Sequence, residues 1–222
     1  MFKSCAPRSR RPGVAWSLSS WLLVSLLCLG PIPAFATTAV DIVRVEEDWE
    51  VVVGTPDLES VSPQITCAMS PTQGDDGNYA SFELNHQSQP GYAAGGLHLH
   101  AWDGDYLIGS QHEHSSACLA ESGETIQWTQ AMSVGDGLLT YEVLNGQSET
   151  WGSFGGASLR VQQSTSLADL NDYSVTASLV NSGVGYGANR VVALKLLRVR
   201  LILANGVVQE LNVHQDVRSA TN

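Results

Sequence analysis

The chain has 222 residues, of which 22 are acidic and 11 are Lys or Arg, so its formal net charge is −11. Such an acidic protein repels nucleic acid and anionic membrane surfaces, and both are excluded as partners. No apolar run after residue 36 is long enough to cross a bilayer, so no membrane insertion is expected beyond that point.

Residues 1–36 have the pattern of a secretory signal peptide. Basic residues precede the apolar run Leu18–Leu29, and Ala34-Phe35-Ala36 supplies the small residues of a cleavage site. We therefore expect cleavage near Ala36 and a protein that is secreted or retained in the cell envelope or periplasm. Residues 37–222 suit one domain in length and show no break in composition.

Charge and cysteine are unevenly distributed along the remaining chain. Between Val45 and Leu159 there are 17 acidic residues and no Lys or Arg. Cys5 and Cys28 belong to the signal segment, which leaves Cys67 and Cys118. An even pair of cysteines in an oxidising compartment predicts a disulfide between them.

Alternation of apolar and polar residues with a period of two dominates the chain after the signal segment. Turn signals such as Asp103-Gly104, Asn145-Gly146 and Asn205-Gly206 separate the alternating segments. The predicted strands are 40–45, 49–53, 64–69, 79–85, 96–101, 106–111, 125–132, 138–144, 158–163, 173–180, 191–203 and 207–213. About a dozen short strands predict an all-β, two-sheet antiparallel β-sandwich of jelly-roll type. Only Ser166–Leu170 is predicted to form a helical turn.

The last hairpin has two possible registers. A two-residue turn at Asn205-Gly206 mixes polar and apolar residues on both faces of the hairpin. A three-residue loop with Gly206 at positive φ instead pairs Arg200 with Glu210 and Val199 with Leu211. This register separates a charged face from an apolar face, and we therefore predict it.

Four histidines form two pairs on neighbouring predicted strands: His98 with His100, and His112 with His114. A two-residue turn at Asp103-Gly104 sends the pairs to opposite faces, whereas a three-residue loop puts all four on one face. In the second case His98 and His112 lie about 13 Å apart along the strands. A metal site would then need a bulge at Gly109, and exposed strand histidines are the alternative.

An acidic row occupies alternate positions of one strand: Glu46, Asp48 and Glu50. This E-x-D-x-E spacing resembles the strand motif of laminarinase-type retaining glycosidases, which have a concanavalin-like jelly-roll fold. The resemblance implies that Glu46 is the nucleophile, Asp48 its electrostatic helper and Glu50 the acid/base. The sequence departs from the motif at Glu47, where an aliphatic residue is expected. The same residues are also explained by an acidic row that prevents an exposed edge strand from pairing with another chain. We therefore expect a protein without catalytic activity.

Hard oxygen ligands for Ca²⁺ gather in two turns. Asp75, Asp76 and Asn78 lie in the first turn, and Asp103 and Asp105 lie in the second. Asp and Asn also populate turns for backbone reasons alone, and no EF-hand spacing is present. We therefore expect no cofactor. A bound Ca²⁺ ion is the alternative.

Aromatic residues cluster in the middle and late strands: Trp102, Tyr106, Trp128, Tyr141, Trp151 and Tyr186. Sugar rings stack on such side chains, which makes Trp102, Tyr106 and Trp151 the predicted binding residues. The competing interpretation, that the tryptophans fill the core, is the one that we favour.

The segment Tyr141–Gly146 followed by Glu149–Gly152 resembles the strand-turn-strand region of concanavalin-like and laminin-G-like jelly rolls. The resemblance implies a sandwich fold with a carbohydrate- or protein-binding role. We therefore expect a non-catalytic binding module for a glycan or an extracellular protein partner. A structural protein of the envelope or matrix and a retaining glycosidase are the alternatives.

Overall fold

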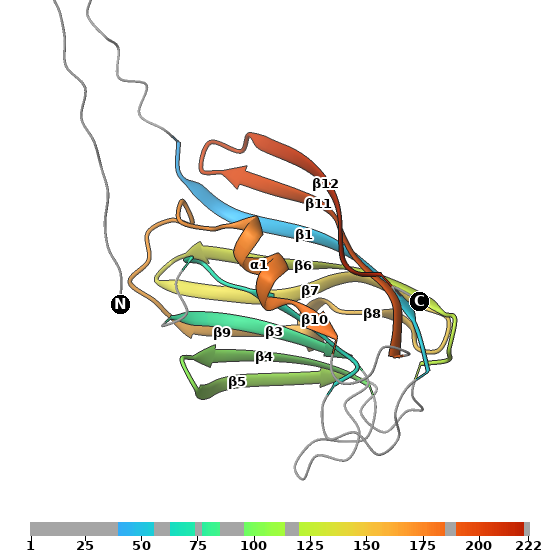
Figure 1. Cartoon of the computed structure of the whole chain (residues 1–222). Helices are drawn as coiled ribbons and strands as arrows, with labels where there is room; N and C mark the ends of the chain where they lie inside the picture. The colour runs from blue at the N-terminus through green and yellow to red at the C-terminus, as the bar shows by residue number, and fades with distance from the viewer. Residues whose placement is uncertain are drawn as a thin grey trace, which may run out of the picture. The chain divides into compact units, whose positions relative to one another are not determined.

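A computed structural model describes residues 40–55, 63–73, 77–84, 96–113, 120–184 and 190–219. Its strands form two antiparallel sheets, which confirms the predicted all-β sandwich (Figure 1). Ala39–Asn222 forms one compact unit. Within the described residues, no helix combines the length and the hydropathy needed to cross a membrane. The predicted signal segment lies outside the described residues.

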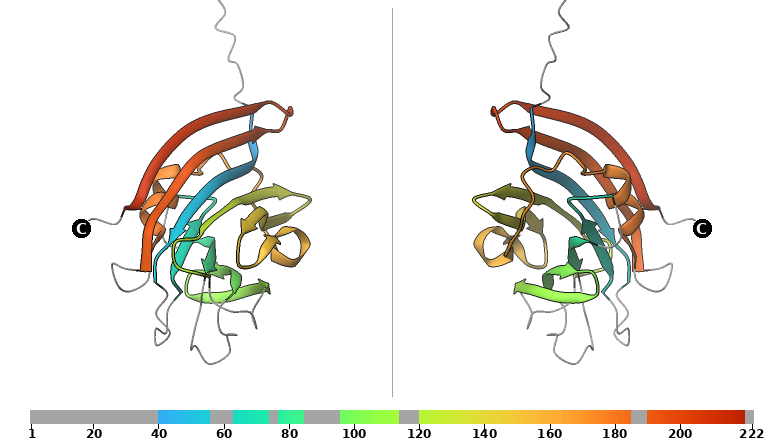
Figure 2. Two further views of the ribbon diagram at one scale, coloured as in Figure 1. Left: turned by 90° about the vertical axis from the view of Figure 1, so that its right-hand side faces the viewer. Right: turned by 90° about the vertical axis from the view of Figure 1, so that its left-hand side faces the viewer.

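The larger sheet, sheet A, has seven strands. Figure 2 shows β12, β11 and β1 running as neighbouring curved strands on one side of it. In spatial order its strands are β12 (Val208–Ser219), β11 (Val191–Leu203), β1 (Ile42–Val53), β6 (Thr125–Gly135), β7 (Leu138–Ser148) and β8 (Gly152–Phe154), and β9 (Arg160–Ser164) also pairs with β7.

The smaller sheet, sheet B, has five strands and carries the only α-helix of the described residues beside it. That helix, α1 (Val175–Asn181), contacts β2, and a 3-10 turn, η1 (Gly156–Leu159), precedes β9. In spatial order the strands are β10 (Gly183–Val184), β2 (Ile65–Met69), β3 (Asn78–Leu84), β4 (Leu97–Asp103) and β5 (Tyr106–Glu113).

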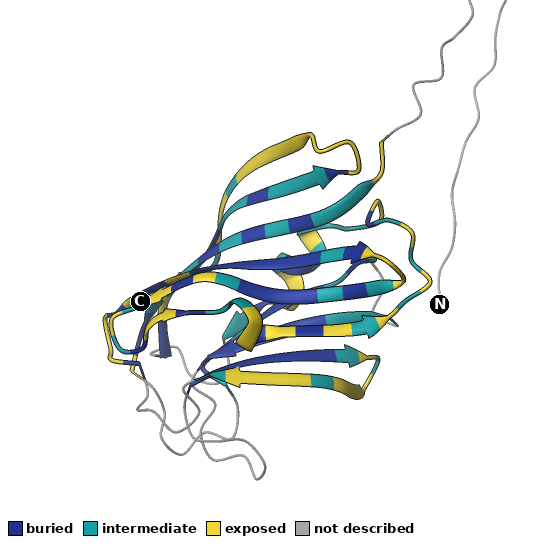
Figure 3. Cartoon of the chain, turned by 180° about the vertical axis from the view of Figure 1, so that it is seen from behind, coloured by how far each residue is buried: buried dark blue, intermediate teal, exposed yellow. Residues whose placement is uncertain are grey.

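Aromatic side chains form the core between the sheets. Trp49 and Trp128 are cross-strand neighbours with parallel rings 6.4 Å apart. Phe82 of sheet B packs on Trp128 of sheet A with ring centroids 5.2 Å apart, so the cluster joins the two layers. Figure 3 shows the alternation of buried and less buried positions along β1 that places Trp49 inward.

The acidic strand is not an edge strand. The strands predicted at 40–45 and 49–53 are one continuous strand, β1, which begins at Ile42 and lies between β11 and β6. The edge explanation of Glu46, Asp48 and Glu50 is therefore wrong. Arginines of neighbouring strands stabilise the acidic row, which allows it to occupy the middle of a sheet.

Two predicted elements in the segment before β10 are wrong. The segment 173–180, predicted as a strand, is helical from Val175 onward as part of α1, and Ser166–Leu170 has no regular structure instead of a helical turn. Val175 and Leu179 pack against the core from α1. Their separation of four residues fits both a period of two and one turn of helix, so alternation does not distinguish the two structures.

The predicted register of the last hairpin is confirmed. Arg200 pairs with Glu210 and Val199 with Leu211, and Gly206 has a φ of 83°. A left-handed residue at this loop position favours glycine, which explains why the chain turns here in this register.

Cys67 is a free thiol with no exposed surface. The predicted disulfide is therefore absent at Cys67, and its predicted partner Cys118 lies outside the described residues. Cys67 occupies an inward position of β2 in the core between the sheets. A cysteine in this position packs as a small apolar side chain.

Candidate functional site

The outer face of sheet B combines aromatic and polar side chains. In β3, Ala80, Phe82 and Leu84 point into the core, so Tyr79, Ser81 and Glu83 point to the other face. The same alternation in β4 brings three more residues to that face: His98, His100 and Trp102. Antiparallel pairing then sets Tyr79 opposite Trp102, Ser81 opposite His100 and Glu83 opposite His98.

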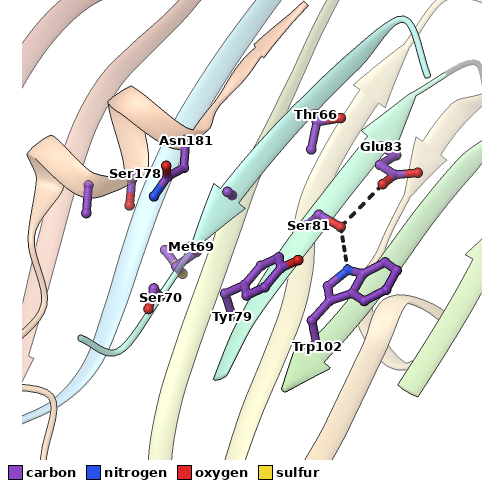
Figure 4. A pocket seen from close by; sticks show the side chains of 11 residues that line it. Thr66, Met69, Ser70, Tyr79, Ser81, Glu83, Trp102, Ser178 and Asn181 are labelled. Carbon is purple, nitrogen blue, oxygen red and sulfur yellow. Dashed lines mark hydrogen bonds between the residues drawn. The ribbon is translucent and has the colours of Figure 1, made fainter. Parts of the chain in front are cut away.

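A pocket of 410 Å³ opens where this face meets α1. Its size is within the range of small-molecule sites. In Figure 4, Ser178 and Asn181 of α1 lie on one side of the pocket, and Trp102 lies on the opposite side. The lining residues are Thr66, Ala68, Met69, Ser70, Tyr79, Ser81, Glu83, Trp102, Ala177, Ser178 and Asn181.

A chain of hydrogen bonds fixes the aromatic wall of the pocket. The rings of Tyr79 and Trp102 are stacked, with centroids 6.1 Å apart and planes 12° apart. Trp102 Nε1 donates to Ser81 Oγ over 3.1 Å, and Ser81 Oγ donates to Glu83 Oε1 over 3.3 Å. The indole is thus anchored by its N–H edge, while its ring face lines the pocket (Figure 4).

The Asp and Glu side chains near the pocket act on the Tyr79 phenol that lines it. Burial raises the pKa of the Tyr79 phenol, and the charges of Asp105 and Glu83 raise it further. Glu83 is the only charged residue among the pocket's lining residues. The site therefore offers an aromatic surface, one carboxylate, five hydroxyl groups including the Tyr79 phenol, and one amide.

Both predicted registers of the histidine strands are wrong. Asp103 belongs to β4 and pairs with Tyr106, so the two-residue turn lies at Gly104-Asp105. A bulge at Ile108 then shifts the pairing of the two strands by one further residue. His98 consequently lies opposite His112, with ring centroids 6.1 Å apart.

His98 and His100 of β4 and His112 of β5 share one face beside the pocket. The rings of His98 and His100 are 5.8 Å apart, and His100 Nδ1 lies 3.5 Å from Glu83 Oε1. Both His98 and His100 are buried. The fourth histidine of the prediction, His114, lies outside the described residues.

No arrangement of three His, Cys, Asp or Glu side chains suited to a metal ion occurs in the described ranges. Of the predicted Ca²⁺ ligands, Asp75 and Asp76 lie outside those ranges. Asn78 begins β3 and pairs with Asp103, and Asp105 occupies the exposed β4–β5 turn.

A buried carboxyl group lies behind α1. Glu47 has no exposed surface and accepts hydrogen bonds from Trp49 Nε1 over 2.9 Å and from the Tyr173 hydroxyl over 2.6 Å. Burial raises the pKa of Glu47, although hydrogen bonds from Tyr173, Ser178 and Trp49 oppose the shift. Ser178 also lines the pocket, so this polar group supports the helix that forms the pocket wall.

The three carboxylates of the glycosidase motif lie on the outer face of sheet A and not among the lining residues of the pocket. Arg44 and Arg200 contact Glu46, with the shorter contact at 2.7 Å. Asp48 accepts from Arg198 and Arg200, and Glu50 accepts from Gln127. All three carboxylates are therefore engaged in ion pairs or hydrogen bonds with other side chains of sheet A.

The predicted binding residues separate in the structure. Trp102 lines the pocket, whereas Tyr106 is 79% exposed at the β4–β5 turn and Trp151 is 7% exposed in the core. Trp128 and Tyr141 are also buried, as the core alternative predicts. Tyr186 lies outside the described residues.

Sequence reasoning missed most of the pocket. Tyr79, Ser81 and Glu83 occupy the polar phase of a strand whose other phase is Ala80, Phe82 and Leu84. That amphipathic pattern was a usable signal, because it puts the three side chains on one face. Asn181 gave no such signal, since its segment was predicted as a strand.

Comparison of the sequence with protein-family models finds no matching family, and comparison with curated proteins finds no match.

Proposed function

We propose that this protein is an exported, non-catalytic glycan-binding module whose site is the pocket between α1 and the outer face of sheet B. The observation that carries the proposal is the stacked Tyr79–Trp102 pair beside Glu83, Ser81 and Asn181 in one pocket. Apolar faces of sugar rings pack on aromatic side chains. Sugar hydroxyl groups need polar partners at the rim, and carboxylate, hydroxyl and amide groups supply them.

The fixed position of Trp102 supports the same function. Its indole N–H is held by Ser81, which is itself hydrogen-bonded to Glu83. An aromatic surface fixed before the ligand arrives loses little conformational entropy on binding. The exported location rests on the charge and hydropathy pattern of residues 1–36 and remains part of the proposal.

A glycan array followed by titration calorimetry tests the proposal. Trp102→Ala should weaken binding of the selected oligosaccharide by about tenfold or more, which corresponds to about 1.4 kcal/mol. Tyr106→Ala is the matched control, because Tyr106 is a highly exposed aromatic residue that does not line the pocket. Its affinity should equal that of the unmodified chain.

Three results would contradict the proposal: no binding on the array, equal affinity of the Trp102→Ala variant, or an equal loss in both variants. Circular dichroism of each variant verifies that the strands are intact. A structural protein of the envelope or matrix would bind no oligosaccharide and would instead associate with itself, which sedimentation measures.

A further inference from the structure

The pocket is lined by one carboxylate and by no Lys or Arg, and the imidazole of His100 lies 3.5 Å from that carboxylate. Glu83 lines the pocket, and Asp103 and Asp105 lie at the nearby end of β4. From Val45 to Leu159 the sequence contains no Lys or Arg, and this stretch includes β2, β3, β4 and β5 with the connections between them. Residues 161–189, which contain α1 and β10, also lack Lys and Arg. An anionic ligand would therefore meet no Lys or Arg from these elements.

Four arginines on sheet A are already paired with carboxylates. Arg44, Arg160, Arg198 and Arg200 each contact a carboxylate on a neighbouring strand or on their own strand, at distances of 3.3 Å or less. Moving one of these arginines toward a ligand on sheet B would break its ion pair. These four arginines are consequently held on sheet A.

The aromatic pair of the pocket also attracts positive charge. The faces of indole and phenol rings carry negative charge density and attract a cation that lies within about 6 Å of the ring centroid. The positive N–H edge of Trp102 is directed at Ser81, the Tyr79 ring stacks with the indole, and the His100 ring meets the indole edge-on with centroids 5.9 Å apart. Glu83, two residues from Ser81 along β3, supplies a full negative charge in the same pocket.

We propose that the glycan bound in this pocket carries free amino groups, as in a deacetylated amino-sugar polymer, with the ammonium group bound from the pocket side by Glu83 and the Tyr79–Trp102 pair. This inference rests on the proposed function and names its ligand class. The carboxylate and the ring faces would bind the ammonium group, and the sugar ring would pack against the aromatic surface.

Four oligosaccharide probes of equal length test the inference: oligomers of glucosamine, N-acetylglucosamine, glucose and galacturonic acid. At a pH where the amine is protonated, glucosamine oligomers should bind about tenfold more tightly than the N-acetylated and glucose oligomers. Galacturonic acid oligomers should not bind. The preference for glucosamine should fall as salt is raised, because salt screens a charge-based interaction.

Glu83→Gln removes the charge and keeps the shape of the side chain, so it should abolish the tenfold preference. Glu121→Gln is the matched control, since Glu121 is exposed and lies outside the pocket lining, and it should retain the preference. If Glu83→Gln fails to fold, the salt titration of the unmodified chain still tests whether the preference for glucosamine oligomers depends on charge.

The outcomes separate the two proposals. Tight binding of glucose, N-acetylglucosamine or galacturonic acid oligomers without a preference for glucosamine would overturn the amino-sugar inference and leave glycan binding standing. Absence of binding to all four probes would overturn the inference, and absence of binding across the whole array would overturn the proposed function as well.

Discussion

The Tyr173 hydroxyl donates a 2.6 Å hydrogen bond to Glu47 Oε1, although 126 residues separate the two in the sequence. Trp49 Nε1 donates to the other carboxyl oxygen, so both oxygens of this fully buried group have a donor. Tyr173 directly precedes the helix cap at Ser174. The hydrogen bond thus holds α1, and with it the Ser178 and Asn181 wall of the pocket, against the inner face of sheet A.

The raised pKa of Glu47 predicts a pH dependence of stability. In the unfolded chain a Glu titrates at about 4.3, whereas burial raises the pKa of Glu47 in the folded chain. The folded chain therefore retains this proton at a higher pH than the unfolded chain. The Glu47 contribution to the free energy of unfolding is fully present below about pH 4.3 and is lost as pH rises through the folded-state pKa.

Glu47→Gln isolates this contribution, because an amide can hydrogen-bond to Trp49 and Tyr173 without carrying charge. Urea unfolding of both proteins across pH 4 to 8 is the measurement. The variant should gain stability relative to the unmodified chain as pH rises. A difference between the two proteins that does not vary with pH would contradict the prediction.

The Cys67 thiol is expected to be unreactive in the folded protein. Burial raises its pKa well above the ordinary value, and the Glu47 charge raises it further, so almost no thiolate is present at neutral pH. Iodoacetamide should leave Cys67 unmodified in buffer and alkylate it in urea without reductant. Peptide mass spectrometry identifies the modified residue. Recovery of a Cys67–Cys118 cross-linked peptide would contradict the free thiol.

Gly146 is required by its contact with Phe154. A Cβ at this position would lie 2.2 Å from two ring carbons of Phe154, a core residue that stacks on Phe82. Gly146→Ala should therefore lower the free energy of unfolding by about 1–3 kcal/mol, as overpacking of a core does. Urea denaturation monitored by tryptophan fluorescence measures the change.

Gly135→Ala is the control for this substitution. A Cβ at Gly135 would have no heavy atom within 4 Å, and its backbone is not among those with positive φ. Its effect on the free energy of unfolding should stay within about 0.5 kcal/mol. Equal losses in both variants would indicate a general intolerance of alanine in these strands and would contradict the Phe154 explanation.

Local sequence patterns predicted the correct secondary structure where the spacing of apolar residues fitted the period of a strand and not that of a helix. The alternation of Leu97, Leu99 and Ala101 with His98, His100 and Trp102 predicts a strand with two unlike faces, and β4 has them. The charge pattern around Asn205-Gly206 also fixed the register of the last hairpin, because a shift of one residue would have mixed its faces. The prediction was wrong at 173–180, because the spacing of the apolar residues there fitted the period of a strand and the period of a helix equally well.

Local patterns were sufficient for the all-β class, most strand positions and the lack of Lys and Arg between Val45 and Leu159, because side-chain direction and charge are local properties of a strand. They could not reveal that β1 is a central strand, that a bulge at Ile108 places His98 opposite His112, or that Tyr79 and Trp102 share a pocket with α1. Strand order, bulges and helix docking depend on contacts between residues far apart in the chain, and no local period encodes such contacts.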